Sequence, residues 1–139
     1  MSDFVTISSW AWAVGLVGLA LAGFTYRYVK GQPSGSEAME ALAEQIHDGA
    51  MAFLRREYEM LAVFVAVVAA LLAWAVSTPT AGAYLVGALC SVTAGFFGMK
   101  SATRANVRTS AAANQEGAGK ALRVAFFGGA VMGLSVAAL

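Results

Sequence analysis

The stretch GFFGMKSATRANVRTSAAANQEGAGKALRVAFFGGAVMGL, residues 95–134, joins the end of one apolar run to the start of another through a basic, amide-rich segment. Lys100, Arg104 and Arg108 recur at every fourth position, so on a helix they form one charged stripe directly after the apolar run that ends near Met99. Such a stripe is typical of a membrane boundary. The stretch therefore predicts two apolar helices that are connected on one side of a bilayer.

The composition of the whole chain supports this interpretation. The 139 residues are 59% hydrophobic and only 12% charged, and the mean hydropathy is +0.68. These values are too apolar for an ordinary soluble domain and are typical of an integral membrane protein. The single cysteine, Cys90, excludes a disulfide within the chain and a paired-cysteine metal site.

Four transmembrane helices are expected, at about residues 4–29, 37–78, 81–113 and 119–139. The first has the length needed to cross a hydrocarbon core of roughly 30 Å. Asp3 is the only charge before it, whereas a cleavable signal peptide would have a basic start. GQPSGSE at residues 31–37 interrupts the helical pattern and offers Ser36 as a helix cap.

The second helix is expected to lie half in water. Apolar side chains fall close to one face of residues 37–59 and charged side chains line the rest, whereas residues 60–76 are continuously apolar. Ser77–Thr80 then predicts a short uncharged turn, and the fourth span is expected to begin after Gly117 and Gly119.

Small residues recur at every fourth position in the last three spans, and this spacing lets another helix backbone approach closely. The stripes consist of Ala62, Ala66 and Ala70; Ala83, Gly87, Ser91 and Gly95; and Ala121, Ala125, Gly129, Gly133 and Ala137. We therefore expect an all-α integral membrane fold whose helices pack through small-residue seams. Because the chain stops at Leu139 without a terminating signal, we expect it to be part of a larger polytopic bundle.

The positions of the cations predict the orientation in the membrane. All nine Lys and Arg residues lie within residues 27–56 and 100–123. Under the positive-inside rule the amino terminus is extracytoplasmic, and the first and third loops are cytoplasmic. Trp10, Trp12, Tyr26 and Tyr28 lie near the two ends of the first span, as expected of interfacial aromatic belts, with simple core aromatics as the alternative.

Three polar clusters are candidate sites, and each also has a plainer structural explanation. Lys100, Arg104, Arg108, Lys120 and Arg123 could hold a phosphate-rich ligand, but the segment lacks a glycine-rich phosphate loop and an acid cluster for Mg²⁺, which favours membrane anchoring. Glu44, His47 and Asp48 could ligate a metal ion or relay a proton, or form a solvated helix face. Arg55, Arg56 and Glu59 are best explained as a charged collar at the headgroups, with Arg55 and Glu59 as a local pair.

The two central spans contain no group that could carry an ion. Residues 60–76 and 81–99 contain no Asp, Glu, Lys, Arg or His, and intramembrane ion paths usually need such groups. We therefore assign no catalytic, substrate-binding or metal-binding residue within this chain.

Three runs carry a family resemblance: IHDGAMAFLRREYEML at 46–61, GFFGMKSATRANVRTSAAAN at 95–114 and GKALRVAFFGGAVMGLSV at 119–136. In this order and at these separations they resemble the amino-terminal part of membrane-integral, ion-translocating inorganic pyrophosphatases. The resemblance extends over roughly the last two thirds of the chain, and the first helix has no comparable signature.

The resemblance implies an enzyme that couples hydrolysis of inorganic pyrophosphate to transport of H⁺ or Na⁺. It implies a homodimer in a lipid bilayer, the cell inner membrane in a bacterium, with Mg²⁺-pyrophosphate bound on the cytoplasmic side by an inner ring of helices. The four helices here would belong to the outer ring and pack on the remaining helices of the same polypeptide. The family's catalytic motifs have no matching positions in this chain, so the segment alone is expected to be inactive.

The resemblance leaves the choice of ion and any dependence on K⁺ open, and we expect no nucleic-acid partner. The alternative is a self-sufficient four-helix membrane protein, either a small transporter or a non-enzymatic assembly subunit.

Overall fold

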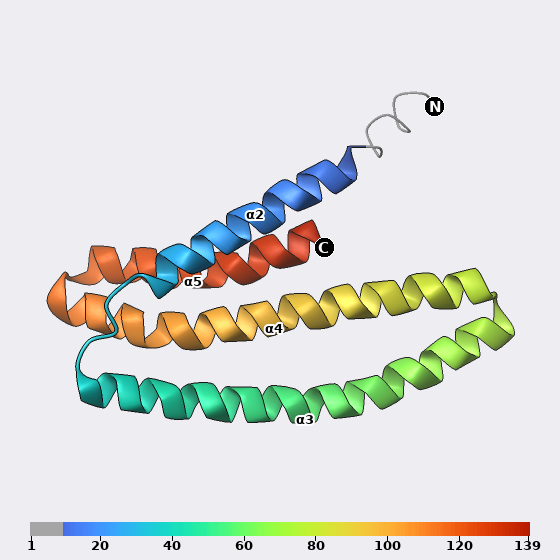
Figure 1. Ribbon diagram of the computed structural model, residues 1–139, viewed down its shortest axis with the longest axis horizontal. Coiled ribbons are helices and arrows are strands. Elements are labelled where there is room, and N and C mark those ends of the chain that lie inside the picture. Colours follow the sequence, from blue (N-terminus) through green and yellow to red (C-terminus); the bar gives the residue numbers. More distant parts are fainter. Residues whose placement is uncertain (1–9) are drawn as a thin grey trace.

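The computed structural model describes residues 10–139, which form four long helices that alternate in direction (Figure 1). The helices are α2 (Ala11–Lys30), α3 (Glu37–Ala75), α4 (Thr78–Gln115) and α5 (Ala118–Ala138). All four are long and apolar enough to cross a membrane. The predicted all-α membrane architecture is thereby confirmed, although residues 4–9 of the expected first span lie outside the described part of the chain.

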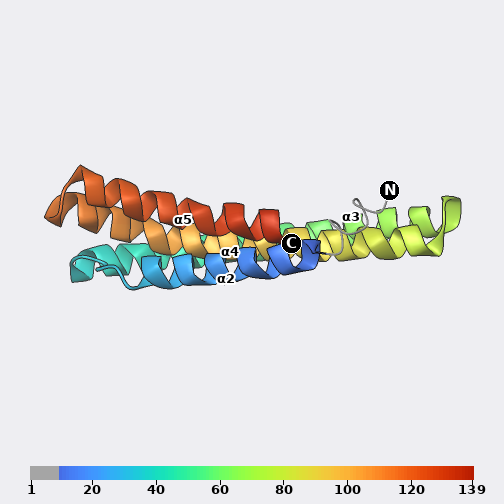
Figure 2. The same ribbon diagram turned by 90° about the horizontal axis from the view of Figure 1, so that it is seen from above.

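Two of the helices are about twice as long as the other two. α3 and α4 contain 39 and 38 residues, so each is about 57 Å long, against a hydrocarbon core of roughly 30 Å. α2 and α5 contain 20 and 21 residues. Both short helices lie beside the half of α4 that is near its C-terminus, and the tip of the α3–α4 hairpin projects beyond them (Figures 1 and 2).

The end of the bundle where α2 leads into α3 and α4 leads into α5 is here called the basic end (Figure 1). Residues 27–56 and 100–123 contain all nine cations of the chain and lie in the half of the bundle nearer this end, with Arg55 and Arg56 near the middle of α3. The opposite end, where Ala75 leads to Thr78, is the apolar hairpin. Long helices with charges at one end only are expected when the rest of each helix faces hydrocarbon.

The turn of the apolar hairpin is shorter than the sequence predicted. We expected Ser77–Thr80 to form the turn, but α3 ends at Ala75 and α4 begins at Thr78. Ser77 is the N-cap of α4, and its Oγ accepts a hydrogen bond from the Thr80 amide at 3.3 Å. Pro79 lies in the first turn, where a missing amide hydrogen costs no intrahelical bond.

The other two helix starts lie at or close to the predicted residues. Ser36 caps α3 as expected, because its Oγ accepts from the Met39 amide at 3.4 Å. α5 begins at Ala118, after Gly117 as its N-cap. Gly117 has a φ of 89°, which lies in the region that glycine occupies without strain.

The closest helix contact lies between α4 and α5. A Cβ placed on Gly128 would lie 2.4 Å from the Cβ of Ala105, so only glycine fits there. Ser101 on α4 is fully buried and donates a hydrogen bond from its hydroxyl to the Gly128 carbonyl at 3.1 Å. Val124 and Val131 flank this contact on α5 and are buried. The α4–α5 seam is thus formed by small residues and includes an interhelical hydrogen bond, as in many helix contacts within membranes.

Only part of the predicted stripe on α5 lies in this seam: Ala121 is buried beside Ala112 and Val124, as expected. We expected Gly129 and Gly133 to face a neighbour, but nothing lies within 4 Å of a Cβ built on either, and Gly128 makes the contact instead. Most other members of the predicted stripes are exposed: Ala62, Ala66, Ala70, Ala83, Gly87, Ser91, Ala125 and Ala137. Repetition at every fourth residue defines a face, but the position of the neighbouring helix decides which face is buried.

Two neighbouring glycines provide a matched test of this seam. Gly128→Ala should destabilise the protein by about 1 to 3 kcal/mol because the added methyl group overpacks against Ala105. Gly129→Ala should leave stability unchanged or raise it slightly, because alanine favours helix and nothing is nearby. Thermal unfolding of the protein in detergent measures both. Equal melting temperatures for the two variants would contradict the packing described here.

Candidate functional site

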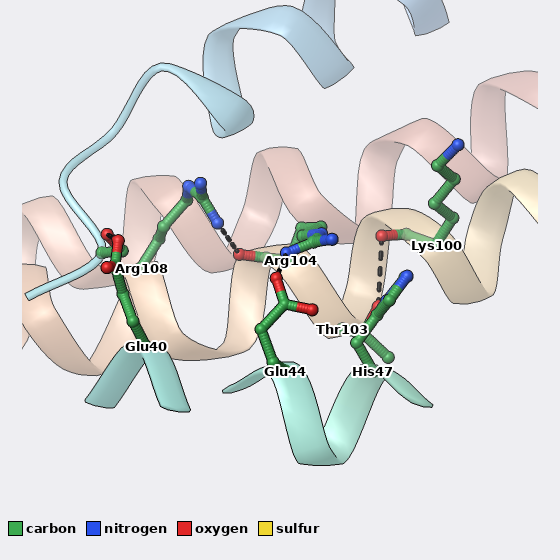
Figure 3. A network of polar contacts seen from close by, with 8 residues as sticks. Glu40, Glu44, His47, Lys100, Thr103, Arg104 and Arg108 are labelled. Carbon is green, nitrogen blue, oxygen red and sulfur yellow. Dashed lines mark hydrogen bonds and ion pairs between the residues drawn. The ribbon is translucent and has the colours of Figure 1, made fainter. Parts of the chain in front are cut away.

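The basic end contains a set of polar contacts between α3 and α4 (Figure 3). Glu40, Glu44 and His47 lie on the side of α3 that faces α4, opposite Arg104 and Arg108 (Figure 3). Arg104 Nη1 donates to Glu44 Oε1 at 2.7 Å, which joins residues that are 60 positions apart. We call these residues, together with Thr103 on α4 and the 31–36 link, the α3–α4 clasp.

The ion pair of the clasp sets the charge state of Glu44. Hydrogen bonding and attraction from Arg104 lower the pKa of the Glu44 carboxyl, which lies well before the apolar run of α3. A lowered pKa stabilises the folded protein at neutral pH, and this contribution is lost as the pH falls through the lowered value. Because Glu44 is exposed to solvent, the contribution is small.

His47 contacts Thr103 across the same helix pair. Its Nδ1 lies 2.8 Å from Thr103 Oγ1, and that hydroxyl also lies 3.1 Å from the Met99 carbonyl, to which it donates. A hydroxyl has a single hydrogen, so when Thr103 donates to its own helix the imidazole donates from Nδ1, and the two roles follow the tautomer of the ring. The contact joins α3 to α4 one turn from the ion pair of Glu44 and Arg104.

Arg108 fastens the link between α2 and α3. Its Nε donates to the Gln32 carbonyl at 3.1 Å, and its Nη1 donates to the Arg104 carbonyl at 2.9 Å. Burial, and then repulsion from Arg104, lower the pKa of the Arg108 guanidinium, which stays protonated because its ordinary pKa is so high. The Ser34 hydroxyl donates to Glu40 in the same region. The link is thus held against both α3 and α4.

The five cations considered as a phosphate cradle have different neighbours. Arg104 and Arg108 are engaged in the clasp. Lys100 points away from α3 (Figure 3), and its Nζ lies 5.6 Å from the centre of the Phe96 ring. Lys120 pairs with Glu116 at 3.6 Å, and Arg123 lines a groove on α5. The structure therefore does not bring these five cations to one point.

The candidate metal or proton-relay set is likewise divided. Glu44 faces Arg104, His47 faces Thr103 and Asp48 is exposed. Across residues 10–139, no group of three or more His, Cys, Asp or Glu side chains could hold a metal ion.

The predicted collar on α3 is a local arrangement. Glu59 lies 3.6 Å from Arg55 and 3.5 Å from Arg56, which confirms the expected pairing of Arg55. Both arginines are more than 80% exposed, at 86% and 82%, so these pairs add little stability. One turn away, the Tyr58 hydroxyl donates to the Val92 carbonyl at 2.8 Å and ties α3 to α4.

Sequence reasoning missed the three hydroxyl groups that connect the helices, which belong to Tyr58, Ser101 and Thr103. Serine and threonine are common within membrane helices, and most bond to their own helix, as Thr93 does with the Leu89 carbonyl at 2.7 Å. Only the clustering of Ser101 and Thr103 with the cations of α4 hinted at a contact with neighbouring helices.

Four apolar helices with their charges at one end define an α-helical, multi-pass integral membrane protein. The chain belongs to the family described as inorganic H⁺ pyrophosphatase, whose family model matches residues 16–139. The resemblance noted in the sequence is therefore confirmed.

Three relatives are similar over most of this chain. A Clostridium tetani protein is 45% identical over 134 residues, which make up 96% of this chain and 19% of the relative. A K⁺-insensitive pyrophosphate-energized proton pump of Methanosarcina mazei is 39% identical over 90% of this chain and 19% of its own length. A K⁺-stimulated pyrophosphate-energized sodium pump of Thermotoga maritima is 42% identical over 88% of this chain and 17% of its own length. The chain thus spans about a fifth of the length of these relatives.

The contact between His47 and Thr103 can be tested with an isosteric change. Thr103→Val removes the hydroxyl that accepts from His47 and should destabilise the protein by about 1 kcal/mol. Thr93→Val is the matched control, because the Thr93 hydroxyl is exposed and bonds only within α4. Thermal unfolding in detergent should show a lower midpoint for Thr103→Val alone. If both variants have the same unfolding midpoint as the wild type, the contact between His47 and the Thr103 hydroxyl does not stabilise the protein.

Proposed function

We propose that these residues form the amino-terminal outer helices of a membrane pump that couples hydrolysis of inorganic pyrophosphate to the transport of H⁺ or Na⁺. The observation that carries the proposal is the family match over residues 16–139, on a chain whose helices fit a membrane. The similar proteins of M. mazei and T. maritima are named as pumps of this kind. Because they are named for different ions and are similar to this chain at nearly the same identity, the likeness favours neither ion.

The proposed role of the segment is to hold the pump together rather than to carry out its chemistry. The apolar stretches of α3 and α4 contain no ionisable side chain between residues 60 and 76 or between 81 and 99. Two charged groups at the basic end are engaged in contacts between elements, since Arg104 pairs with Glu44 and Arg108 donates to the Gln32 carbonyl. In this proposal these contacts of Arg104 and Arg108 fix the register of α3 against α4 and hold the link between α2 and α3 in place.

Mg²⁺ and pyrophosphate would be bound elsewhere in such a pump. The described residues provide no set of carboxylates that fits Mg²⁺, and hard divalent cations need several oxygen ligands. In this proposal the catalytic, substrate and metal residues lie on other helices of the pump. Binding of K⁺ and assembly of two copies into a homodimer also belong to the proposal for the whole pump.

We further propose that the basic end faces the cytoplasm and that the amino terminus is extracytoplasmic. Support comes from the distribution of charge, because the turn between Ala75 and Thr78 contains no cation and the basic end contains nine. Cations favour the cytoplasmic side of a membrane protein.

The activity is tested by reconstituting the full-length protein that carries this segment. With Mg²⁺ it should hydrolyse pyrophosphate and should move H⁺ or Na⁺ into vesicles, whereas residues 1–139 alone should do neither. Phosphate release and an ion-sensitive dye measure the two steps. A full-length protein that transports a solute without hydrolysing pyrophosphate would favour the alternative of a small transporter, and hydrolysis by residues 1–139 would disprove the scaffold role.

The orientation is tested by labelling introduced cysteines in a cysteine-free version of the protein, in which Cys90 is also replaced. In intact cells a membrane-impermeant maleimide should label Thr78→Cys in the turn of the apolar hairpin. Gln115→Cys at the basic end should react only after the membrane is permeabilised. Both positions are exposed, so access to the reagent depends on the side of the membrane. The reverse pattern would place the basic end outside.

A further inference from the structure

A groove runs between α2 and α5 near the basic end, with a volume of about 670 Å³. Its lining is chiefly apolar, from Phe24, Leu122, Phe126 and Phe127, with Tyr28 and one cation, Arg123, beside them. Phe24, Leu122 and Phe126 are 70–72% exposed. A patch of exposed, large apolar side chains is typical of a surface that binds another apolar group.

The charge around this groove is positive. Arg123 lines it and has no ion pair with a carboxylate among residues 10–139. Arg27 and Lys30 occupy the last turn of α2. Lys120 lies one turn before Arg123 and pairs with Glu116, the one acidic partner found near the groove in the described chain. The groove thus combines an apolar surface with the guanidinium of Arg123, which no carboxylate of residues 10–139 neutralises.

The groove also lies where the charged and the uncharged parts of α2 and α5 meet. Arg27 is the first charge on α2 after the uncharged residues 10–26, and Arg123 is the last charge on α5 before the uncharged residues 124–139. The rings of Tyr28 and Phe127 meet edge to face with centroids 5.0 Å apart, which brings the two charge borders to neighbouring levels of the antiparallel pair. A molecule in the groove would have one part beside arginine and another beside phenylalanine.

We infer that the groove binds one anionic phospholipid, with the Arg123 guanidinium on its phosphate and an acyl chain over Phe24, Leu122 and Phe126. A guanidinium forms strong, charge-assisted hydrogen bonds with phosphate oxygens, and basic pockets between membrane helices are suited to anionic headgroups. A free phosphate ion would leave the apolar bed uncovered. A helix of the same protein seated there would bury Arg123 at considerable cost unless it brought a carboxylate.

The binding is tested on the full-length protein in detergent by native mass spectrometry, with dioleoylphosphatidylglycerol and dioleoylphosphatidylcholine as the two probes. The wild type should retain one phosphatidylglycerol more tightly than any phosphatidylcholine. Arg123→Gln should weaken that binding about tenfold, the loss expected for one hydrogen-bonded charge. Arg56→Gln is the control, because Arg56 is 82% exposed on α3 and lies outside the groove.

A second measurement reports on the acyl chain and does not depend on Arg123. Leu122→Trp introduces an indole at an exposed position of the lining. In vesicles of phosphatidylcholine with a small fraction of brominated phosphatidylglycerol, the fluorescence added by this substitution should be quenched more than by the same fraction of brominated phosphatidylcholine. Combining it with Arg123→Gln should remove the difference.

Three results would overturn the inference. They are equal affinity of wild type and Arg123→Gln for phosphatidylglycerol, displacement of that lipid by millimolar inorganic phosphate or pyrophosphate, and equal quenching by the two brominated lipids. The first and third would mean that another part of the protein, or bulk lipid, covers the groove. The inference rests on the membrane setting and not on pyrophosphate hydrolysis, so an inactive protein with the expected lipid binding would contradict only the proposed function.

Discussion

The rest of this structure depends on the cost of placing charge in hydrocarbon, where no water compensates it. Helices satisfy their own backbone hydrogen bonds and can therefore cross a bilayer, but Lys and Arg side chains must stay near its surface. The chain meets this constraint by holding all nine cations at one end of the bundle. α3 and α4 extend beyond the length of a membrane span so that their charged portions can meet in water.

α4 is the helix that contacts all three others, although α2 packs mainly against α5. It packs against α5 along one face and against α3 along another, and it also contacts α2. On its α5 side the contact is close because Gly128 has no side chain opposite Ala105. On its α3 side the contact is polar, through Arg104 with Glu44 and Thr103 with His47. The same turns of α4 thus form a close small-residue seam on one face and a polar clasp on another.

Local features of the fold could be predicted from the sequence, because they depend on neighbours along the chain. The Ser36 cap and the pairing of Arg55 with Glu59 are of this kind. The pair formed by Glu44 and Arg104 could not be predicted, because 60 residues separate them and only the register of two helices brings them together.

On α5 the predicted contact at Gly129 differs by one residue from the observed contact at Gly128. A one-residue shift rotates a helical position by about 100°, so a stripe through Gly129 and a contact at Gly128 indicate different faces. For the candidate site, the residue types predicted a charged membrane border. The pairing of these residues depends on how the helices pack, so the sequence alone could not predict it.

The most direct test of the account is to measure how deep α3 lies along its length. Nitroxide labels at Gln45 and Val67, which are both exposed, would be compared in nanodiscs by their collision rates with oxygen and with a water-soluble nickel chelate. The account predicts that the label at Gln45 collides more with nickel and the label at Val67 more with oxygen, because one long helix passes from water into lipid. A preference for oxygen at both positions, or for nickel at both, would contradict it.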